Sequence, residues 1–218
     1  MNKLNKLRKE VLRISYKAGA CHIGSSLSCL NIIYNLYFKT MKKDDLFVFS
    51  KASGVSALYV VLAEKGIILR EKLVYYLKNY PLPDSKVPGV IFTGGSLGHG
   101  LPFAVGMALA LKKQKKKGRV FCLVGDGDMQ EGTTWESLLF RRQHRLDNLK
   151  IIYDANGLQA CGEVEKILTL PLKFLEENGV NVFYTIKGAG IRFLEDKVES
   201  HYLNLTKQTY EEAIKQIN

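Results

Sequence analysis

The chain has 218 residues, of which 46% are hydrophobic and 24% charged, and this composition is that of an ordinary globular protein rather than a disordered or fibrous one. Its first sixteen residues mix charged with apolar side chains, so neither a signal peptide nor a membrane span is expected. The net charge of +11 does not predict a nucleic-acid partner, because residues 112–119 hold much of the local excess and suit the solvated end of a helix.

Hydrophobic periodicity predicts helices and short apolar strands that alternate along the chain. Helices are expected at residues 3–17, 28–40, 55–64, 70–79, 101–114, 133–144, 170–178 and 207–217, and strands at 46–50, 119–124, 149–154 and 180–184. Short apolar strands separated by helices indicate crossover units. We therefore predict one three-layer α/β/α domain over residues 1–218, with a mostly parallel sheet.

Polar side chains follow two of the predicted strands. Asp126 comes after the strand that ends in FCLVG, and Asn156 comes after KIIYDA. Ligands of such sheets collect beyond the carboxyl ends of the strands, and carboxylate and amide oxygens suit Mg²⁺. Gly125 and Gly127 leave room for a diphosphate to approach the backbone. The pattern predicts a metal–diphosphate site, although the alternative of a plain strand-to-helix turn with a capping aspartate stays open because short glycine patterns are weak.

The longer pattern resembles a known family. A GDG segment followed by asparagine thirty positions after its aspartate is similar to the fingerprint of thiamine diphosphate enzymes. Residues 125–162, GDGDMQEGTTWESLLFRRQHRLDNLKIIYDANGLQACG, resemble the diphosphate-binding core of transketolases, and most of all the N-terminal subunit of the split form. The segments KAGACHIGSSLS, FVFSKASGVSALYVVLAEKG, TGGSLGHGLPFAVGMALA and TIKGAGIRFLEDKVESHY also resemble the family, so the likeness extends over most of the chain.

This resemblance implies a thiamine diphosphate-binding (PP) fold and a set of cofactor ligands. Asp126, the Asn156 side chain and the Leu158 carbonyl would hold Mg²⁺ or Ca²⁺. The Gly127 backbone would donate to the diphosphate. The remaining positions implied to contact the cofactor are Gly95, Leu97, Gly125 and Ser53.

The same resemblance implies four catalytic residues. His22 and His201 match histidines near the reacting carbons of the donor sugar and near the cofactor. Glu131 and Glu136 match an acidic pair that connects two active sites through buried hydrogen bonds. Without the family, each of these histidines would be read as a surface or core side chain, and each glutamate as a helix-terminal or surface charge.

Three substitutions depart from the family pattern on the substrate side. Ser53 and Leu82 stand where the family has histidines, and His99 stands where glutamine is usual. Leucine neither donates, accepts nor changes charge near neutral pH, whereas histidine does all three. We therefore expect ketol transfer between sugars or sugar phosphates, with a non-standard donor or acceptor.

Two segments of the family pattern are absent. A helix and a strand usually lie between the positions of Phe183 and Thr185, so the edge of the sheet is expected to be shorter here. The sequence also has no segment for the pyrimidine-binding half, which carries the glutamate that activates thiamine. We expect that half on a separate C-terminal transketolase subunit, in an α₂β₂ assembly.

Two other functions remain open at this point. One is a different thiamine diphosphate enzyme subunit, such as a 2-oxo acid decarboxylase or a dehydrogenase E1 subunit. The other is a non-catalytic scaffold subunit that kept the fold.

The four cysteines are far apart and form no C-x-x-C pair, so reduced thiols and a cytoplasmic location are expected.

Overall fold

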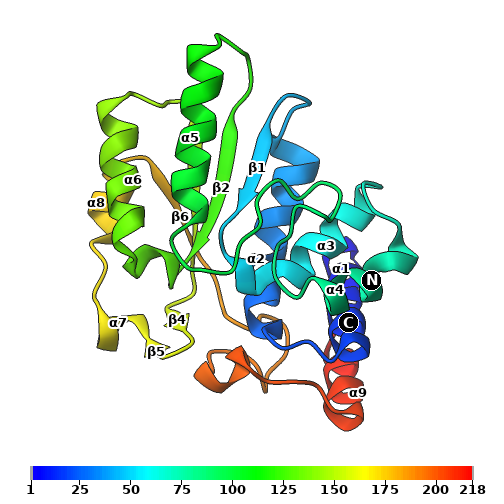
Figure 1. Cartoon of the computed structure of the whole chain (residues 1–218). Helices are drawn as coiled ribbons and strands as arrows, with labels where there is room; N and C mark the ends of the chain where they lie inside the picture. The colour runs from blue at the N-terminus through cyan, green and yellow to red at the C-terminus, as the bar shows by residue number, and fades with distance from the viewer. Residues whose placement is uncertain (1, 218) are drawn as a thin grey trace.

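Four parallel strands form the centre of the protein in the computed structural model, which describes residues 2–217 (Figure 1). Their order across the sheet is β1-β2-β3-β6. The predicted strands are all confirmed to within one residue at each end: β1 (Leu46–Phe49), β2 (Val120–Gly125), β3 (Leu149–Ala155) and β6 (Val180–Tyr184). Residues 1 and 218, the two ends of the predicted domain range, lie outside the described residues.

The predicted helices also occur in the predicted order, and a short helix at Val164–Ile167 was not predicted. They are α1 (Lys3–Ala18), α2 (Ile23–Asn35), α3 (Val55–Glu64), α4 (Leu73–Asn79), α5 (Gly100–Lys113), α6 (Gly132–Gln143), α7 (Val164–Ile167), α8 (Leu172–Glu177) and α9 (Lys207–Gln216). Five turns of 3-10 or π geometry complete the set at Leu36–Thr40, Ala52–Gly54, Arg70–Lys72, Asp128–Gln130 and Val198–His201. A short hairpin was not predicted. It pairs two strands of two residues each, β4 (Leu158–Gln159) and β5 (Gly162–Glu163), and strands this short have no periodicity.

Helix α2 begins at Ile23, five residues earlier than predicted. The prediction was wrong here because Gly24, Ser25 and Ser26 have low helix propensity. Tertiary packing explains the early start: all three residues are buried, and a Cβ at Gly24 would come within 2.7 Å of the Ser200 hydroxyl. The helix therefore approaches the C-terminal segment closely at this point.

Two hydrophobic clusters lie on opposite faces of the sheet. Phe121 and Leu123 of β2 pack with helices α1 to α4 on one face. Val120, Cys122 and Val124 of the same strand pack under α5, α6 and α8 on the other face. A parallel strand covered on both faces is expected to be apolar throughout, and β2 is buried along its whole length. The three-layer α/β/α prediction is confirmed.

Strand β6 forms one edge of the sheet, where the sequence predicted a missing strand and helix. It pairs with β3 on its inner side only, among the residues that the structure describes. Its last residues, Phe183 and Tyr184, are 46% and 69% exposed. The chain then continues into the segment around Lys187, which lies at the carboxyl ends of the strands.

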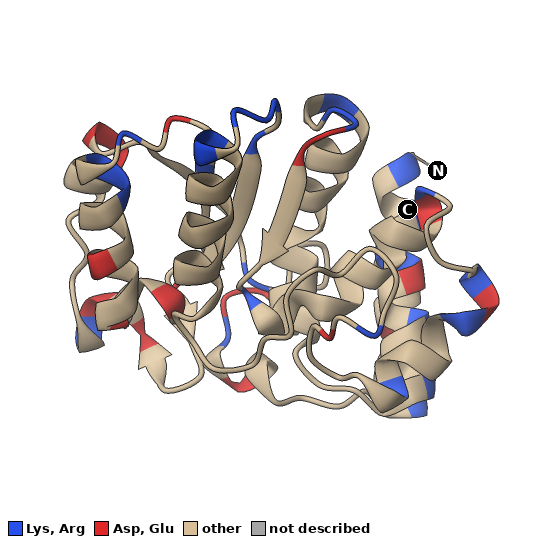
Figure 2. Ribbon diagram, turned by 45° about the horizontal axis from the view of Figure 1, so that its top comes forward, with Lys and Arg blue, Asp and Glu red and all other residues tan. Residues whose placement is uncertain are grey.

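Charged residues lie mainly on the helices and the connecting loops (Figure 2). The basic run of residues 112–119 covers the end of α5 and the loop into β2, at the amino ends of the strands. Across residues 2–217, the structure contains no helix with the length and apolar character needed to cross a membrane.

The buried centre of β2 leads to a stability prediction. Replacing Leu123, which is fully buried between two strands, with alanine is expected to lower the free energy of unfolding by about 3 kcal/mol, because it leaves a cavity in the core. Urea unfolding followed by circular dichroism measures the change. Leu69→Ala is the control, since Leu69 is 61% exposed, and equal midpoints for the two variants would contradict the prediction.

Candidate active site

A cavity of about 340 Å³ opens at the carboxyl ends of β1, β2 and β3. Its walls come from the N-terminal part of α2, the loop before α5, the β4–β5 hairpin and the turn near the C-terminus. Nine of the twelve residues predicted for the site line it: His22, Ser53, Gly95, Leu97, Gly125, Asp126, Gly127, Leu158 and His201. Segments that are far apart in the sequence therefore meet where the strand pattern predicted a ligand.

Asp126 and Asn156 lie side by side at the ends of neighbouring strands. The backbone amide of Asn156 donates to one carboxylate oxygen of Asp126 at 3.2 Å. The backbone amide of Gly157 and the Tyr153 hydroxyl donate to the other oxygen at 3.1 and 2.8 Å. Burial raises the pKa of Asp126 in spite of these hydrogen bonds and the charge of Lys51. A buried carboxylate with a raised pKa would be stabilised as an anion by a nearby cation.

The Asn156 side chain borders the cavity without lining it. Its Oδ1 accepts from the Leu158 amide at 3.1 Å, and its Nδ2 lies 3.4 Å from the Ser28 hydroxyl. The Leu158 residue itself lines the cavity. The carboxylate of Asp126, the amide oxygen of Asn156 and the carbonyl of Leu158 are hard oxygen donors of the kind that Mg²⁺ and Ca²⁺ use, so this chain has suitable ligands for either ion.

Glycines form the floor of the cavity. A Cβ at Gly125 would come within 3.0 Å of the Lys51 side chain, and a Cβ at Gly127 would come within 3.0 Å of the Leu97 side chain. Both positions are therefore closely packed even without a side chain. The Gly125 amide donates to Asp128 at 2.9 Å, so a phosphate group beside Asp126 would meet the Gly127 backbone at this floor.

A buried ion pair stands behind this floor. The Lys51 ammonium donates to Asp154 at 2.7 Å, and the two side chains are only 6% and 0% exposed. Asp154 also accepts from the hydroxyls of Ser28 and Thr185. Burial alone would lower the pKa of Lys51, but the Asp154 charge raises it above its usual value, so Lys51 stays charged.

A second buried lysine has no carboxylate partner among the described residues. Lys187 is fully buried, and its Nζ lies 3.3 Å from Nδ1 of His201. Burial and the neighbouring charge of Lys51 lower the pKa of Lys187 to about 8. A buried ammonium with this surrounding is stabilised when an anion binds nearby.

The two predicted catalytic histidines lie in contact. The ring centroids of His22 and His201 are 4.8 Å apart, and the His22 amide donates to the His201 carbonyl at 3.0 Å. Burial, together with the positive charge of Lys187, lowers the pKa of both rings, and that of His201 to about 4. Both histidines are therefore neutral at pH 7 and able to accept a proton or a hydrogen bond.

Asp128 holds three sides of the cavity together. Its carboxylate accepts from the Gly98 amide at 2.9 Å, the Gly125 amide at 2.9 Å and the Ser50 hydroxyl at 2.7 Å. These partners belong to the loop before α5, the end of β2 and the end of β1. The side chain is 1% exposed, and burial raises its pKa despite the three hydrogen bonds.

The predicted acidic pair lies outside the cavity. Glu131 is half-buried just before α6, where its side chain packs against Gly98, and Glu136 is exposed on α6. Leu139 and Phe140, on the same helix, are 66% and 40% exposed. His99 is also exposed, its ring bonds to the Leu97 carbonyl, and it does not line the cavity, so it does not replace a cavity imidazole in this structure.

Sequence reasoning missed four residues that shape the site: Lys51, Asp128, Asp154 and Lys187. Each lies directly at a predicted strand end or in a segment that resembles the family, and this position in the sequence is the signal that could have identified it. Lysine and aspartate are almost never fully buried unless they are paired. The sequence does not say which of many charged side chains point inward.

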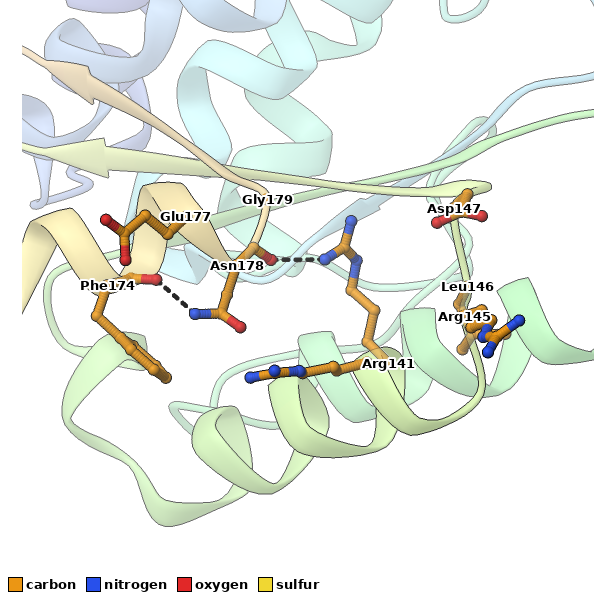
Figure 3. Close-up of a pocket in the computed structure, with 9 residues that line it drawn as sticks. Arg141, Arg145, Leu146, Asp147, Phe174, Glu177, Asn178 and Gly179 are labelled. Atoms are coloured by element: carbon orange, nitrogen blue, oxygen red, sulfur yellow. Dashed lines mark hydrogen bonds between the residues drawn. The ribbon is translucent and has the colours of Figure 1, made fainter.

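Another hollow on the surface lies away from this cavity. It measures about 650 Å³ and is lined by residues of α6, α8 and the loops that follow them (Figure 3). Arg141 crosses it to donate to the Asn178 carbonyl at 2.6 Å, which satisfies the end of α8. The exposed carboxylates of Asp147 and Glu177 offset the arginines around it. The hollow thus contains a helix cap rather than converging catalytic groups.

The fold and the cavity define an α/β domain that presents a glycine floor, a buried aspartate and buried lysines at the carboxyl end of a parallel sheet. Comparison with known families assigns it further. Residues 2–173 match the family described as transketolase, thiamine diphosphate binding domain. The chain belongs to this family.

Individual relatives extend the match over nearly the whole chain. An apulose-4-phosphate transketolase subunit of Phocaeicola vulgatus is 35% identical over 259 residues, covering 98% of this chain and 92% of that protein. The 6-deoxy-6-sulfo-D-fructose transketolase subunit SqwG of Clostridium sp. is 31% identical over 264 residues, covering 98% and 94%. Human transketolase is 32% identical over 98% of this chain but only 41% of its own length.

The fold matches solved transketolases as well. The crystal structure of transketolase from Campylobacter jejuni superposes with a TM-score of 0.87 at 25% identity, covering all of this chain and 43% of that one. This chain therefore spans about two fifths of the length of the single-chain transketolases that it matches.

The unpaired charge of Lys187 leads to a prediction about stability and pH. Because the folded-state pKa of Lys187 lies below its usual 10.5, the folded chain is disfavoured when the lysine is protonated, and this cost grows as pH falls from 10.5 to 8. Lys187→Met is expected to raise the thermal midpoint of the chain at pH 7 and to change it less at pH 10.5.

Inorganic pyrophosphate supplies the complementary measurement. It is expected to raise the midpoint of the wild-type chain at pH 7 and to have a smaller effect on Lys187→Met. Lys166→Met is the control, since Lys166 is exposed on α7. A Lys187→Met variant that is less stable than the wild type at pH 7 would show that the buried ammonium is satisfied without an anion.

Proposed function

We propose that this chain is the N-terminal, diphosphate-binding subunit of a split transketolase, which moves a two-carbon ketol unit from a ketose donor to an aldose acceptor. The observation that carries the proposal is the meeting, at one cavity, of the glycine floor and Asp126 with His201 and the buried Lys187 behind it, which has no carboxylate partner among the described residues. The likeness to relatives that are themselves named as single subunits of transketolases extends over 98% of the chain and supports the same function.

In this proposal each group of residues has a defined task. Asp126, Asn156 and Leu158 hold Mg²⁺ or Ca²⁺, and the Gly127 amide, together with Lys51 and Lys187, binds the diphosphate. Gly95, Leu97 and Ser53, which line the same cavity, would also contact the cofactor. Thiamine diphosphate, when bound, supplies the carbanion chemistry that breaks and forms the carbon–carbon bond.

His22 and His201 act on the sugar. Both are neutral at pH 7 because burial and Lys187 lower their pKa, and both line the cavity near the glycine floor. A neutral imidazole accepts a proton from a hydroxyl group and returns it to a developing alkoxide. We assign the two rings to proton transfer at the hydroxyl and carbonyl oxygens of the donor and acceptor.

The proposal includes a companion subunit that carries the pyrimidine-binding half, while residues 1–218 form one PP-type domain. The relatives are named as one subunit of a larger enzyme, which supports a second chain here too. The exposed Glu136, Leu139 and Phe140 on α6 support pairing of two PP domains along this helix, with Glu131 and Glu136 buried by the pairing. The complete assembly is then an α₂β₂ heterotetramer.

Unpaired cysteines support a cytoplasmic location for this assembly. Cys21, Cys29, Cys122 and Cys161 are all free thiols, and Cys161 is exposed at the cavity. Free thiols are typical of a reducing compartment.

The first test concerns the cofactor. With the companion subunit present, Asp126→Ala is expected to weaken thiamine diphosphate binding at least tenfold, because a metal ligand is lost, and excess Mg²⁺ should restore part of it. Isothermal titration calorimetry measures the affinity. Asp147→Ala, an exposed aspartate outside the cavity, is the control. Unchanged affinity in Asp126→Ala would refute the metal–diphosphate assignment.

The second test concerns the substrate. Leu82 lines the cavity next to Gly95, and Ser53 lies on the same wall, so two positions that carry histidine in the family are apolar or small here. The relatives are named for apulose 4-phosphate and 6-deoxy-6-sulfo-D-fructose, which supports a non-standard sugar for this chain too. We expect low turnover of xylulose 5-phosphate with ribose 5-phosphate.

Restoring the histidines is expected to change that result. The double variant Leu82→His, Ser53→His should raise kcat/KM for the standard pair at least tenfold over the parent enzyme, because imidazoles add donors and acceptors for sugar hydroxyls. A coupled assay of product formation measures kcat/KM for the parent enzyme and for the double variant. Full turnover of the standard pair by the parent would refute the altered substrate, and turnover of a 2-oxo acid instead would indicate a decarboxylase or dehydrogenase subunit.

A further inference from the structure

The outer edge of β6 has backbone groups that point away from the sheet. The Thr185 amide donates to the Ala155 carbonyl of β3 at 3.1 Å. Because the direction of the backbone groups alternates along a strand, the amides and carbonyls of Val182 and Tyr184 point to the opposite side. Within residues 2–217, no strand pairs with that side.

The edge has none of the features that usually keep strand edges apart. Residues 178–185, NGVNVFYT, contain neither a charged residue nor a proline, and β6 pairs with β3 in unbroken register. Phe183, Tyr184 and Ile186 expose 46%, 69% and 47% of their surface. An uncharged, regular edge with exposed aromatic side chains is a template for another strand.

A groove of about 410 Å³ runs beside this edge, between α2 and the face of β2, β3 and β6. Ile32 of α2, Phe121 of β2 and Ile152 of β3 line it, and so does Phe183 of β6. An apolar side chain projecting from an added strand would enter it. We call this hollow the β6 groove; it is also lined by the charged residues Arg119 and Lys150.

The charged side chains in the β6 groove are both basic. Arg119 pairs with Asp45, whereas Lys150 forms no ion pair with any residue from 2 to 217. The whole chain carries a net charge of +11. Electrostatic complementarity therefore favours an acidic occupant over a second copy of this basic chain.

The lengths of the relatives indicate what is missing from this edge. The alignment with the Phocaeicola vulgatus protein spans 259 positions, whereas this chain has 218 residues, so at least 41 positions (259 less 218) have no counterpart here. The sequence indicates that the loss falls between Phe183 and Thr185, at the end of β6. The groove and the edge adjoin that point.

We propose that the outer edge of β6 binds, as a fifth strand, an extended segment of the companion subunit, with an apolar side chain in the β6 groove and an acidic side chain against Lys150. This inference rests on the proposed function, because it needs the companion subunit. The segment bonds to the Val182 and Tyr184 backbone and completes the abbreviated sheet in trans.

Hydrogen exchange tests the proposal with the full chain and the pyrimidine-half chain from the same genome. In the complex, the amides of Val182 and Tyr184 should exchange at least tenfold more slowly than in the chain alone. Val182→Pro should weaken association at least tenfold without lowering the thermal midpoint, because proline removes only an outward-facing amide. Val182→Thr, which keeps the amide, is the matched control.

Lys150→Glu adds a second variant that does not alter the backbone. It should weaken association at low salt, and the difference from wild type should shrink as salt is added. Protection of β6 that grows with the concentration of the chain alone would assign the edge to a second copy and overturn the proposal. Association with unprotected β6 amides and no effect of either variant would overturn it while leaving the proposed function intact. No association at all would overturn both.

Discussion

The hydrogen bonds of Asp128 fix the geometry on which the cavity depends. One carboxylate joins Gly98, Gly125 and Ser50, which belong to three separate segments of the chain. Because the side chain is buried, a substitution that removed it would leave two backbone amides without partners in the interior, at a cost of about 1–3 kcal/mol each. The glycine floor, the end of β1 and the loop with Leu97 are therefore held together by one side chain.

Charge is distributed unevenly around this unit. Lys51 is matched by Asp154, and their ion pair is supported by two hydroxyl groups. Lys187 has only a neutral imidazole beside it, and Asp126 is a buried carboxylate without an ion-pair partner within residues 2–217. A divalent cation at Asp126 would offset the negative charge of its carboxylate, and a diphosphate near the lysines would offset the positive charge of Lys187. The same buried charges that weaken the ligand-free fold thus favour ligand binding.

The sequence predicted those parts of the protein that depend on pattern. The four strands are apolar because both faces of a parallel sheet are covered, and Asp126 and Asn156 meet because parallel strands end at one edge of a sheet. Long side chains are different: the backbone positions of Lys51 and Lys187 were evident, but their inward direction follows from packing. The early start of α2 was missed for the same reason, since burial outweighs the low helix propensity of Gly24 and its serine neighbours. Glu131 is half-buried and Glu136 is exposed in the single chain, so the role of this pair stays a prediction.

His22 adopts a left-handed backbone conformation, with φ of 64°, immediately before α2. Residues other than glycine adopt this conformation at a cost of about 1 kcal/mol or more, and the His22 side chain makes no capping hydrogen bond in return. The ring of this residue packs against the rings of His201 and Tyr202, with centroid distances of 4.8 and 5.4 Å, at the wall of the cavity. Backbone strain and ring packing at the cavity are therefore concentrated in one residue.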